Sequence, residues 1–178
     1  MVDLSKLDAG AVMDRYAKER DKRKTGLGNA QYVETAGEFG RYAETDPSAS
    51  QEIKRDPIVG EVEVLIVGAG FGGILTAARM SEVGITDVRI IDTASDFGGT
   101  WYWNRYPGVQ CDIESYAYLP LLEETGYMPK HRYAFGDEIR GYCQLLGRKY
   151  DLYPKTSFQT AVTKAEWDDA SGRWQVET

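Results

Sequence analysis

The sequence predicts an α/β fold with a parallel β-sheet, an N-terminal helical arm before it and a C-terminal β-hairpin after it. An apolar run at Val62–Val67 is followed by a glycine cluster and a helical pattern, and a second apolar run, VRII, leads into Asp92. Two later strand-like runs flank the turn sequence DDASG. Strands that alternate with helices indicate parallel pairing, whereas a short turn between two strands indicates a hairpin.

Residues 1–60 differ in composition from the rest and are expected to form an arm. A helical pattern runs over residues 7–24, and the sequence TGLGN ends it because glycine and asparagine favour turns. The mixed-charge run KERDKRK in this helix is expected to be a solvated face, with a phosphate or membrane patch as the weaker alternative. The polar remainder, with Pro47 and Pro57, is expected to be irregular. The predicted nucleotide-binding domain therefore covers residues 61–178.

The α/β alternation starts with a strand at Val62–Val67, which is apolar on both faces as in a buried parallel strand. Residues Gly70–Val83 have helical spacing of apolar side chains, and Gly84 suits the C-terminal cap. The second strand is expected at Val88–Asp92. A strand–helix–strand unit of this length should be right-handed and lie at the centre of the sheet.

The second half of the domain begins with residues 93–112, which are rich in glycine and aromatic residues and are expected to form a long loop. A helix is expected at Asp137–Tyr150. Thr156–Gln159 and Ala161–Trp167 are expected to be short strands, the latter paired with Arg173–Glu177 in a hairpin. A strand at the end of a sequence leaves an edge unpaired, so we expect the sequence to be a fragment of a longer protein.

A dinucleotide-binding fingerprint lies at the first strand–helix junction, with the spacing Gly68-x-Gly70-x-x-Gly73. Gly68 permits the tight turn, Gly70 lets the backbone approach a pyrophosphate, and Gly73 allows close helix–strand packing. Asp92 follows Gly68 by 24 residues, close to the spacing of about 20 at which an acid binds a ribose hydroxyl. The pattern predicts a pyrophosphate on the helix N-terminus, whereas a purely structural glycine turn is the alternative interpretation.

Composition argues against several other functions. A net charge of −7 with no dense basic cluster makes nucleic acid a poor candidate partner. The longest apolar run is far shorter than the roughly 20 residues that span a bilayer, and no signal-peptide leader is visible. Cys111 and Cys143 are too few for a disulfide framework and favour a reducing cytosol. The single histidine, His131, leaves no His-rich metal site, and we expect it to be exposed and functionally silent.

A second motif, DFGGTWYWNRYPG at residues 96–108, continues with QCDIES at residues 110–115. Together with the glycine fingerprint it closely resembles the FAD-binding portion of Baeyer–Villiger monooxygenases. These are class B flavoproteins that use FAD and NADPH to insert an oxygen atom from O2 beside a ketone carbonyl. The resemblance covers nearly the whole chain. The arm, with YAKERDKR, is similar to the N-terminal extension of members that act on bulky or polycyclic ketones.

The resemblance implies a Rossmann-like FAD site. The positions that would hold the FAD are Gly68, Gly70, Phe71, Gly72, Gly73, Asp92, Thr100, Trp101, Tyr102, Trp103, Asp112, Tyr118 and Val162. Asp92 would bind the adenosine ribose, and the backbone of Val162, in a strand, would bind the adenine. A further set would face the NADPH, namely Gln110, Cys111 and Asp112. Some relatives have an arginine where this chain has Gln110.

Asp112 is the one residue of this chain for which the resemblance implies a catalytic role, beside the flavin. A carboxylate there could orient a catalytic arginine or act through its charge. A helix N-cap role for Asp112 is equally compatible with the sequence. Tyr118 is evenly balanced between a core position and a cofactor contact. Of the aromatic residues in the second motif we expect one or two to face the flavin and the others to pack beneath it, and we expect Cys111 to be a small buried residue.

The resemblance also implies that much of the catalytic machinery lies on other chain segments. The family's catalytic arginine and its second glycine motif, which binds NADPH, are not found in these 178 residues. The chain alone is therefore expected to bind FAD without catalysing the reaction, and to need C-terminal NADPH and substrate domains. An N- or S-oxidising flavin monooxygenase, an NAD-dependent oxidoreductase and a non-catalytic nucleotide-binding module remain alternatives.

Overall fold

The computed structural model describes residues 8–24, 26–32, 36–37, 40 and 45–178. The chain divides into two compact units, Met1–Thr45 and Asp46–Thr178. Residues 46–60, which have an arm-like composition, fall in the second unit. Each unit is described by itself.

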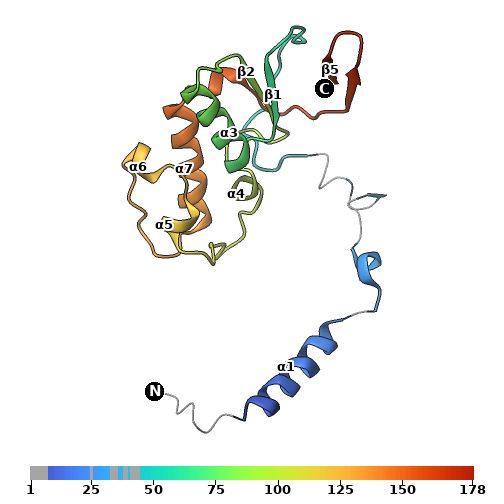
Figure 1. Ribbon diagram of the computed structural model, residues 1–178, viewed down its shortest axis with the longest axis vertical. Helices are drawn as coiled ribbons and strands as arrows, with labels where there is room; N and C mark the ends of the chain where they lie inside the picture. The colour runs from blue at the N-terminus through green and yellow to red at the C-terminus, as the bar shows by residue number, and fades with distance from the viewer. Residues whose placement is uncertain (1–7, 25, 33–35, 38–39, 41–44) are drawn as a thin grey trace. The chain divides into compact units, whose positions relative to one another are not determined.

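The first unit contains one long helix, α1 (Ala9–Arg23), drawn in blue in Figure 1. The Asp8 carboxylate caps it by accepting a hydrogen bond from the backbone N–H of Ala11 at 3.1 Å, which satisfies one of the free donors at a helix start. A short 3-10 helix, η2 (Gly28–Gln31), follows the predicted break. The helix prediction is confirmed, although its first residue, Leu7, lies outside the described residues.

A parallel three-stranded sheet forms the centre of the second unit (Figure 1). It consists of β1 (Val64–Val67), β2 (Val88–Ile91) and β3 (Thr156–Ser157), in that order across the sheet. Both pairings are parallel. The predicted parallel sheet is therefore confirmed, and the carboxyl ends of all three strands lie at one edge, where ligands of this architecture bind.

Two helices pack against each other beside this sheet (Figure 1), α3 (Phe71–Glu82) and α7 (Gly136–Lys149). Both predicted helices are confirmed to within one residue at each end. Gly84 has a φ of +88° just after α3, the left-handed conformation that favours glycine at a helix end. The buried side chains of the two helices join one apolar core: Ile74, Ala77, Ala78, Ile139, Tyr142, Cys143 and Leu146.

Several boundaries differ from the sequence-based expectation. Strand β1 starts two residues later than predicted, and its last side chain, Val67, is 68 % exposed, so this strand is not buried on both faces. The strand expected at Thr156–Gln159 ends at Ser157, because Gln159 has a φ of +51°, which breaks an extended backbone. Val162 lies outside any strand, since β4 begins at Lys164.

The segment over residues 93–112 is not a simple loop, because it contains the short helix α4 (Thr100–Trp103). Two more short helices, α5 (Ser115–Tyr118) and α6 (Leu122–Thr125), were not predicted. Helices of four residues are too short to show a 3.6-residue periodicity of apolar side chains. Their existence depends on tertiary contacts, which the sequence pattern does not reveal.

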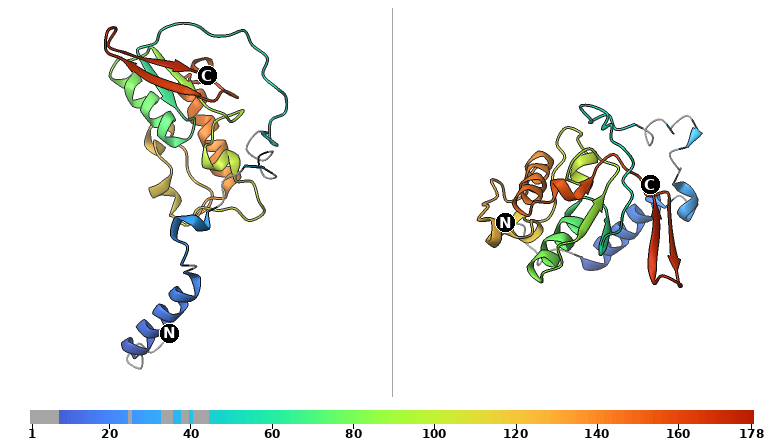
Figure 2. Two further views of the ribbon diagram at one scale, coloured as in Figure 1. Left: turned by 90° about the vertical axis from the view of Figure 1, so that its right-hand side faces the viewer. Right: turned by 90° about the horizontal axis from the view of Figure 1, so that it is seen from above.

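The predicted hairpin is confirmed as an antiparallel pair, β4 (Lys164–Asp168) and β5 (Arg173–Glu177), that forms a sheet of its own (red in Figure 2). Gly172 has a φ of +64° in the turn, as this position requires. Trp167 lies opposite Trp174, and their ring centroids are 5.6 Å apart in an edge-to-face contact. This cross-strand aromatic pair stabilises the hairpin.

Candidate functional site

The glycine fingerprint folds into the turn that the sequence predicts. Gly68 directly follows β1 and has a φ of +109°, a conformation that residues with a side chain rarely adopt. A Cβ atom on Gly73 would overlap the carbonyl oxygen of Gly68 and would approach the Ile66 side chain to 3.3 Å. The first helical turn of α3 is therefore packed directly on the end of β1. Glycine is required at position 73 for this contact, as predicted.

The N-terminus of α3 has free backbone donors that suit an anion. Gly70 is the N-cap and has no side chain, and among the residues that the structure describes no side chain caps this end of the helix. The first N–H groups of a helix have no partner within the helix, and the helix dipole places a partial positive charge there. A phosphate group bound at this end would satisfy these donors.

Asp92 connects the glycine turn to the end of β2. One carboxylate oxygen, Oδ2, accepts a hydrogen bond from the backbone N–H of Ala69 at 2.5 Å, and Oδ1 accepts one from the N–H of Ala94 at 2.7 Å. The sequence predicts only a ribose contact for this acid, so the hold on the glycine turn is an additional role. A carboxylate has about four acceptor positions, so two backbone bonds leave capacity for a ribose hydroxyl.

The glycine fingerprint and the second motif contact each other at Gly70 and Gly99. The N–H of Gly98 donates to the carbonyl of Ala69 at 3.1 Å. A Cβ atom on Gly99 would lie 2.7 Å from the Cα atom of Gly70, and Gly99 itself has a φ of +53°. The backbone of the second motif thus lies directly against the first. Close approach at Gly70 was predicted for a pyrophosphate, and the structure adds Gly99 as a neighbour.

A cavity of about 340 Å³ opens where the two motifs meet. The residues that line it come from the start of α3, from the start of α4 and from α5: Gly70, Phe71, Gly72, Gly98, Gly99, Thr100, Trp101 and Tyr118. Six of these are predicted cofactor residues. Gly98 and Gly99 were not singled out, although both belong to the second motif and their adjacent glycines were the signal that could have found them.

Aromatic side chains form one wall of this cavity. The indole N–H of Trp101 donates to the Tyr118 hydroxyl at 2.9 Å. The ring centroids of Phe71 and Tyr118 lie 5.7 Å apart in an edge-to-face contact. Burial raises the pKa of Tyr118, although the hydrogen bond from Trp101 acts in the opposite direction. Tyr118 therefore belongs both to the packed core and to the cavity wall, so the two interpretations of this residue do not exclude each other.

The remaining aromatic residues of the second motif do not line the cavity. Tyr102 is almost fully buried, with 2 % of its surface exposed, and its hydroxyl donates to the Asp46 carboxylate at 2.5 Å. Trp103 and Tyr106 are 45 % and 61 % exposed. Trp101 thus lines the cavity and Tyr102 is packed in the interior, but the expectation that the other aromatic residues pack beneath the flavin is wrong for Trp103 and Tyr106, because both are exposed. Asp46 is a partner that the sequence analysis missed, because no pattern links residues so far apart.

The residues predicted to face NADPH lie outside the cavity. Gln110 is exposed, and its amide donates to the carbonyl of Tyr133 at 2.7 Å. Cys111 is buried, as expected, with 6 % exposure. Asp112 is exposed. The alternative interpretation of Asp112 as a helix N-cap is wrong, because α5 begins at Ser115 and its N-cap is Glu114.

His131 is exposed, as expected, but it has a partner. Its Nδ1 atom lies 3.3 Å from Oε2 of Glu138. The other oxygen of this carboxylate, Oε1, accepts hydrogen bonds from the Tyr127 hydroxyl and the N–H of Lys130. Burial raises the pKa of Tyr127 to about 12, and the hydrogen bond to Glu138 acts in the same direction. This cluster attaches the segment before α7 to the first turn of that helix.

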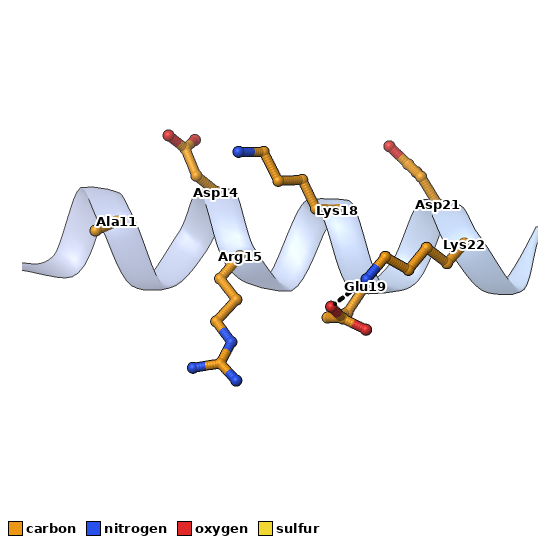
Figure 3. Close-up of a pocket in the computed structure, with 7 residues that line it drawn as sticks. All are labelled: Ala11, Asp14, Arg15, Lys18, Glu19, Asp21 and Lys22. Atoms are coloured by element: carbon orange, nitrogen blue, oxygen red, sulfur yellow. Dashed lines mark hydrogen bonds and ion pairs between the residues drawn. The ribbon is translucent and has the colours of Figure 1, made fainter.

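A shallow hollow along α1 is lined by residues of that helix alone: Ala11, Asp14, Arg15, Lys18, Glu19, Asp21 and Lys22 (Figure 3). All seven are exposed, and both charge signs alternate along the surface. The Lys22 ammonium lies 2.7 Å from a Glu19 carboxylate oxygen. A single helix does not enclose a binding site. The exposed side chains of both charges are therefore those of a solvated helix face, as predicted.

The residues that the structure describes include no group of three histidine, cysteine or acidic residues placed to hold a metal ion. Among the same residues, no helix has both the length and the apolar character needed to cross a membrane. Both cysteines are free thiols and both are buried.

Comparisons with known proteins agree with the geometry. Residues 66–131 match the family model described as NAD(P)-binding Rossmann-like domain. A protein named Baeyer-Villiger monooxygenase from Streptomyces coelicolor is 48 % identical over 167 residues, which are 94 % of this chain and 28 % of that protein. This chain therefore spans about 28 % of the length of that relative.

Solved structures are similar to this chain as well. A polycyclic ketone monooxygenase from the thermophilic fungus Thermothelomyces thermophila is 38 % identical with a TM-score of 0.79, over 92 % of this chain and 27 % of that one. The protein OTEMO, in a complex with FAD and NADP, is 32 % identical with a TM-score of 0.61, over 65 % of this chain and 22 % of that one. The fold is thus a Rossmann-like domain.

Proposed function

This chain belongs to the Baeyer–Villiger monooxygenase family, and from this premise we propose that it is the FAD-binding portion of a longer enzyme that inserts oxygen next to a ketone carbonyl. One observation carries the proposal: the cavity lies between the glycine fingerprint and the second motif, at the uncapped N-terminus of α3. A generic dinucleotide site would not require a second glycine pair, Gly98 and Gly99, against the first motif.

The residues present fit an FAD. The α3 N-terminus offers free N–H groups for the pyrophosphate, and Gly70 and Gly73 keep side-chain atoms out of the turn. Asp92 retains acceptor capacity for the adenosine ribose. We assign the adenine to the backbone of Val162, which follows the carboxyl end of β3. FAD, when bound, supplies the redox chemistry with O2 that side chains lack.

The aromatic wall has a separate role in this proposal. Trp101 and Tyr118 line the cavity with their aromatic side chains, and the indole N–H of Trp101 donates to the Tyr118 hydroxyl, so this N–H requires no water molecule. A ring system bound against them is shielded from water on that side, as flavin chemistry with O2 requires. Thr100, exposed at the start of α4, also lines the cavity.

The NADPH side of the site includes the exposed side chains of Gln110 and Asp112 in this proposal. Cys111 contributes through its backbone, because its thiol is buried. Asp112 is the proposed catalytic residue, and its exposed carboxylate is available to a group from another segment. Most of the NADPH site, the ketone site and the catalytic arginine are assigned to chain beyond these residues. We place the protein in the cytoplasm, which two free thiols support.

Purified full-length protein tests this function directly. It should show flavin absorbance, lose it on removal of FAD, and regain it on addition of FAD but not of NAD. With NADPH, O2 and a panel of cyclic ketones, it should form esters or lactones, detected by mass spectrometry. Oxidation of amines or sulfides without any ester product would favour an N- or S-oxidising enzyme. Absence of FAD binding by the full-length protein would overturn the proposal.

A further inference from the structure

The segment that precedes β1 contains a tight turn at Asp46-Pro47-Ser48-Ala49. The backbone carbonyl of Asp46 accepts from the N–H of Ala49 at 3.2 Å, and its Oδ1 atom accepts from the N–H of Ser48 at 2.9 Å. Aspartate and then proline is the favoured start of such a turn. The turn uses only one of the two carboxylate oxygens.

The other oxygen of Asp46 binds the second motif. Its Oδ2 atom accepts hydrogen bonds from the Tyr102 hydroxyl at 2.5 Å and from the Ser95 hydroxyl at 2.9 Å. Burial acts to raise the pKa of Asp46, but these two hydrogen bonds and the one from Ser48 outweigh it, so that the pKa lies below its usual value. The carboxylate is therefore charged at neutral pH, and hydrogen bonds to a charged acceptor are the strong ones.

Tyr102 connects this carboxylate to the cavity wall. It follows Trp101 in α4, and its N–H donates to the carbonyl of Gly99 at 2.9 Å. A Cβ atom on Gly98 would lie 3.0 Å from the Cβ atom of Tyr102. The Tyr102 side chain therefore packs against Gly98, its backbone binds Gly99, and Trp101 precedes it in the same short helix.

A second attachment holds the same segment. The Gln159 amide nitrogen donates to the Ser95 hydroxyl at 2.7 Å and to the carbonyl of Gln51 at 2.9 Å. The Gln159 amide oxygen accepts from the N–H of Ile53 at 2.7 Å. Ser95 thus bonds to both Asp46 and Gln159. The segment from residue 46 to residue 53 is attached at both ends, so Asp46 has a fixed position from which to hold Tyr102.

We propose that Asp46 is a positioning residue for FAD: through the Tyr102 hydroxyl it holds α4, with Gly99 and Trp101, against the glycine fingerprint. This inference rests on the proposed function, since it assumes that the cavity binds FAD. Asp46 does not line the cavity and acts only through Tyr102. Loss of its carboxylate loosens the wall without removing any atom that contacts the cofactor.

The test uses full-length apoenzyme and an FAD titration followed by flavin fluorescence. The Asp46→Ala variant should bind FAD about tenfold more weakly, the effect expected for loss of charge-assisted hydrogen bonds that order a site. Asp56 supplies a matched control, because it belongs to the other Asp-Pro pair and its side chain is exposed. Asp56→Ala should bind FAD within about twofold of the wild type, as surface substitutions generally do.

A double-mutant cycle separates positioning from loss of the turn. Tyr102→Phe alone should also weaken FAD binding, and Asp46→Ala should have little further effect on FAD binding in that background, because both changes remove the hydrogen bond from Tyr102 to Asp46 through which Asp46 is proposed to act. Additive effects would overturn the inference. Asp46→Asn keeps an acceptor for Ser48 but loses the charge, so it should fold normally and show an intermediate loss, whereas wild-type affinity in this variant would also overturn it.

The outcomes distinguish the inference from the proposed function. If the wild type binds FAD and Asp46→Ala binds it equally well, the inference alone fails. If the wild type binds no FAD, the proposed function and the inference fail together. Circular dichroism of each variant shows that the fold is retained.

Discussion

At the scale of single residues, the site depends on glycines, because a Cβ atom at these positions would overlap neighbouring backbone atoms. Gly73 and Gly99 each lie against backbone, where no side chain can move aside to make room. Gly73 faces the carbonyl of Gly68, and Gly99 faces the Cα atom of Gly70. A Cβ at either position must displace a loop that also forms the cavity. Stability and cofactor binding are therefore coupled at these positions.

Substitution of Gly73 tests this coupling. Gly73→Ala should lower stability by about 1–3 kcal/mol, the usual cost of overpacking, and should weaken FAD binding at least tenfold, roughly the effect of a one-ångström displacement in a site. Thermal unfolding and FAD titration of the full-length protein measure the two effects.

Gly141 provides the control for this prediction. It is an exposed residue of α7, and a Cβ there would meet no atom within 4 Å. Gly141→Ala should leave FAD binding unchanged and raise stability by about 0.5–1 kcal/mol, because alanine restricts the unfolded chain and favours helix. Equal effects of the two substitutions would contradict the role of Gly73.

At the scale of elements, the two short helices α4 and α5 join the fingerprint to the rest of the core. Trp101 of α4 bonds to Tyr118 of α5, and Tyr118 contacts Phe71 at the start of α3. Three helix ends therefore meet at the cavity through one hydrogen bond and two ring contacts, Phe71–Tyr118 and Trp101–Tyr118. Neither short helix has enough residues to be stable by itself, since isolated helices need about 12–15 residues.

The segment before α7 is held by the Glu138 carboxylate, and this contact depends on pH. Burial acts to raise the pKa of Glu138, but hydrogen bonds from Lys130, His131 and Tyr127 outweigh it and lower the pKa below its usual value of 4.5. The folded state therefore binds the proton less tightly than the unfolded state. The stabilisation from Glu138 is present above about pH 4.5 and is lost as the pH falls through the lowered value.

Replacement by glutamine makes this prediction measurable. Glu138→Gln should lower the free energy of unfolding at pH 7 by about 1–3 kcal/mol, the range for hydrogen bonds to a charged group. The difference between the variant and the wild type should shrink as the pH falls below about 4. Urea unfolding of the full-length protein at pH 7 and at a series of lower pH values that extends below pH 4 measures this difference. A difference that does not change with pH would show that the carboxylate charge is unimportant.

At the scale of the whole molecule, the second unit has one apolar core beneath the parallel sheet, while the hairpin β4–β5 forms a separate sheet. The cavity lies at the edge of that core, among residues from three helix ends. A ligand bound there contacts groups far apart in the sequence. It therefore stabilises the folded state as a whole, since the unfolded chain does not bring these groups together.

This coupling predicts a concentration-dependent shift of the melting temperature. FAD at a hundred times its dissociation constant should raise the free energy of unfolding by about 2.7 kcal/mol. Differential scanning fluorimetry of full-length apoenzyme with increasing FAD measures the shift, and AMP, which lacks the flavin, gives the comparison. An equal shift with AMP would argue that the flavin makes no contact of its own.

The sequence by itself determined the parallel sheet, the helices α1, α3 and α7, and the hairpin. It did so because these elements depend on local patterns: apolar periodicity, glycines at helix ends and a turn sequence between strands. It also placed Gly68 and Gly73 correctly, because a positive φ and a close packing contact each leave only glycine possible. Six of the eight cavity residues were among those it predicted.

Only the tertiary structure decided how the two motifs fit together. The short helices, the approach of Gly99 to Gly70, and the burial of Tyr102 on Asp46 involve residues far apart in the sequence. It also excluded the N-cap role of Asp112 and placed Val162 outside a strand. Such features leave no periodic signal, because packing of distant segments overrides local preference. The glycine fingerprint predicts a nucleotide site, but the shape of that site depends on the contacts made by the second motif.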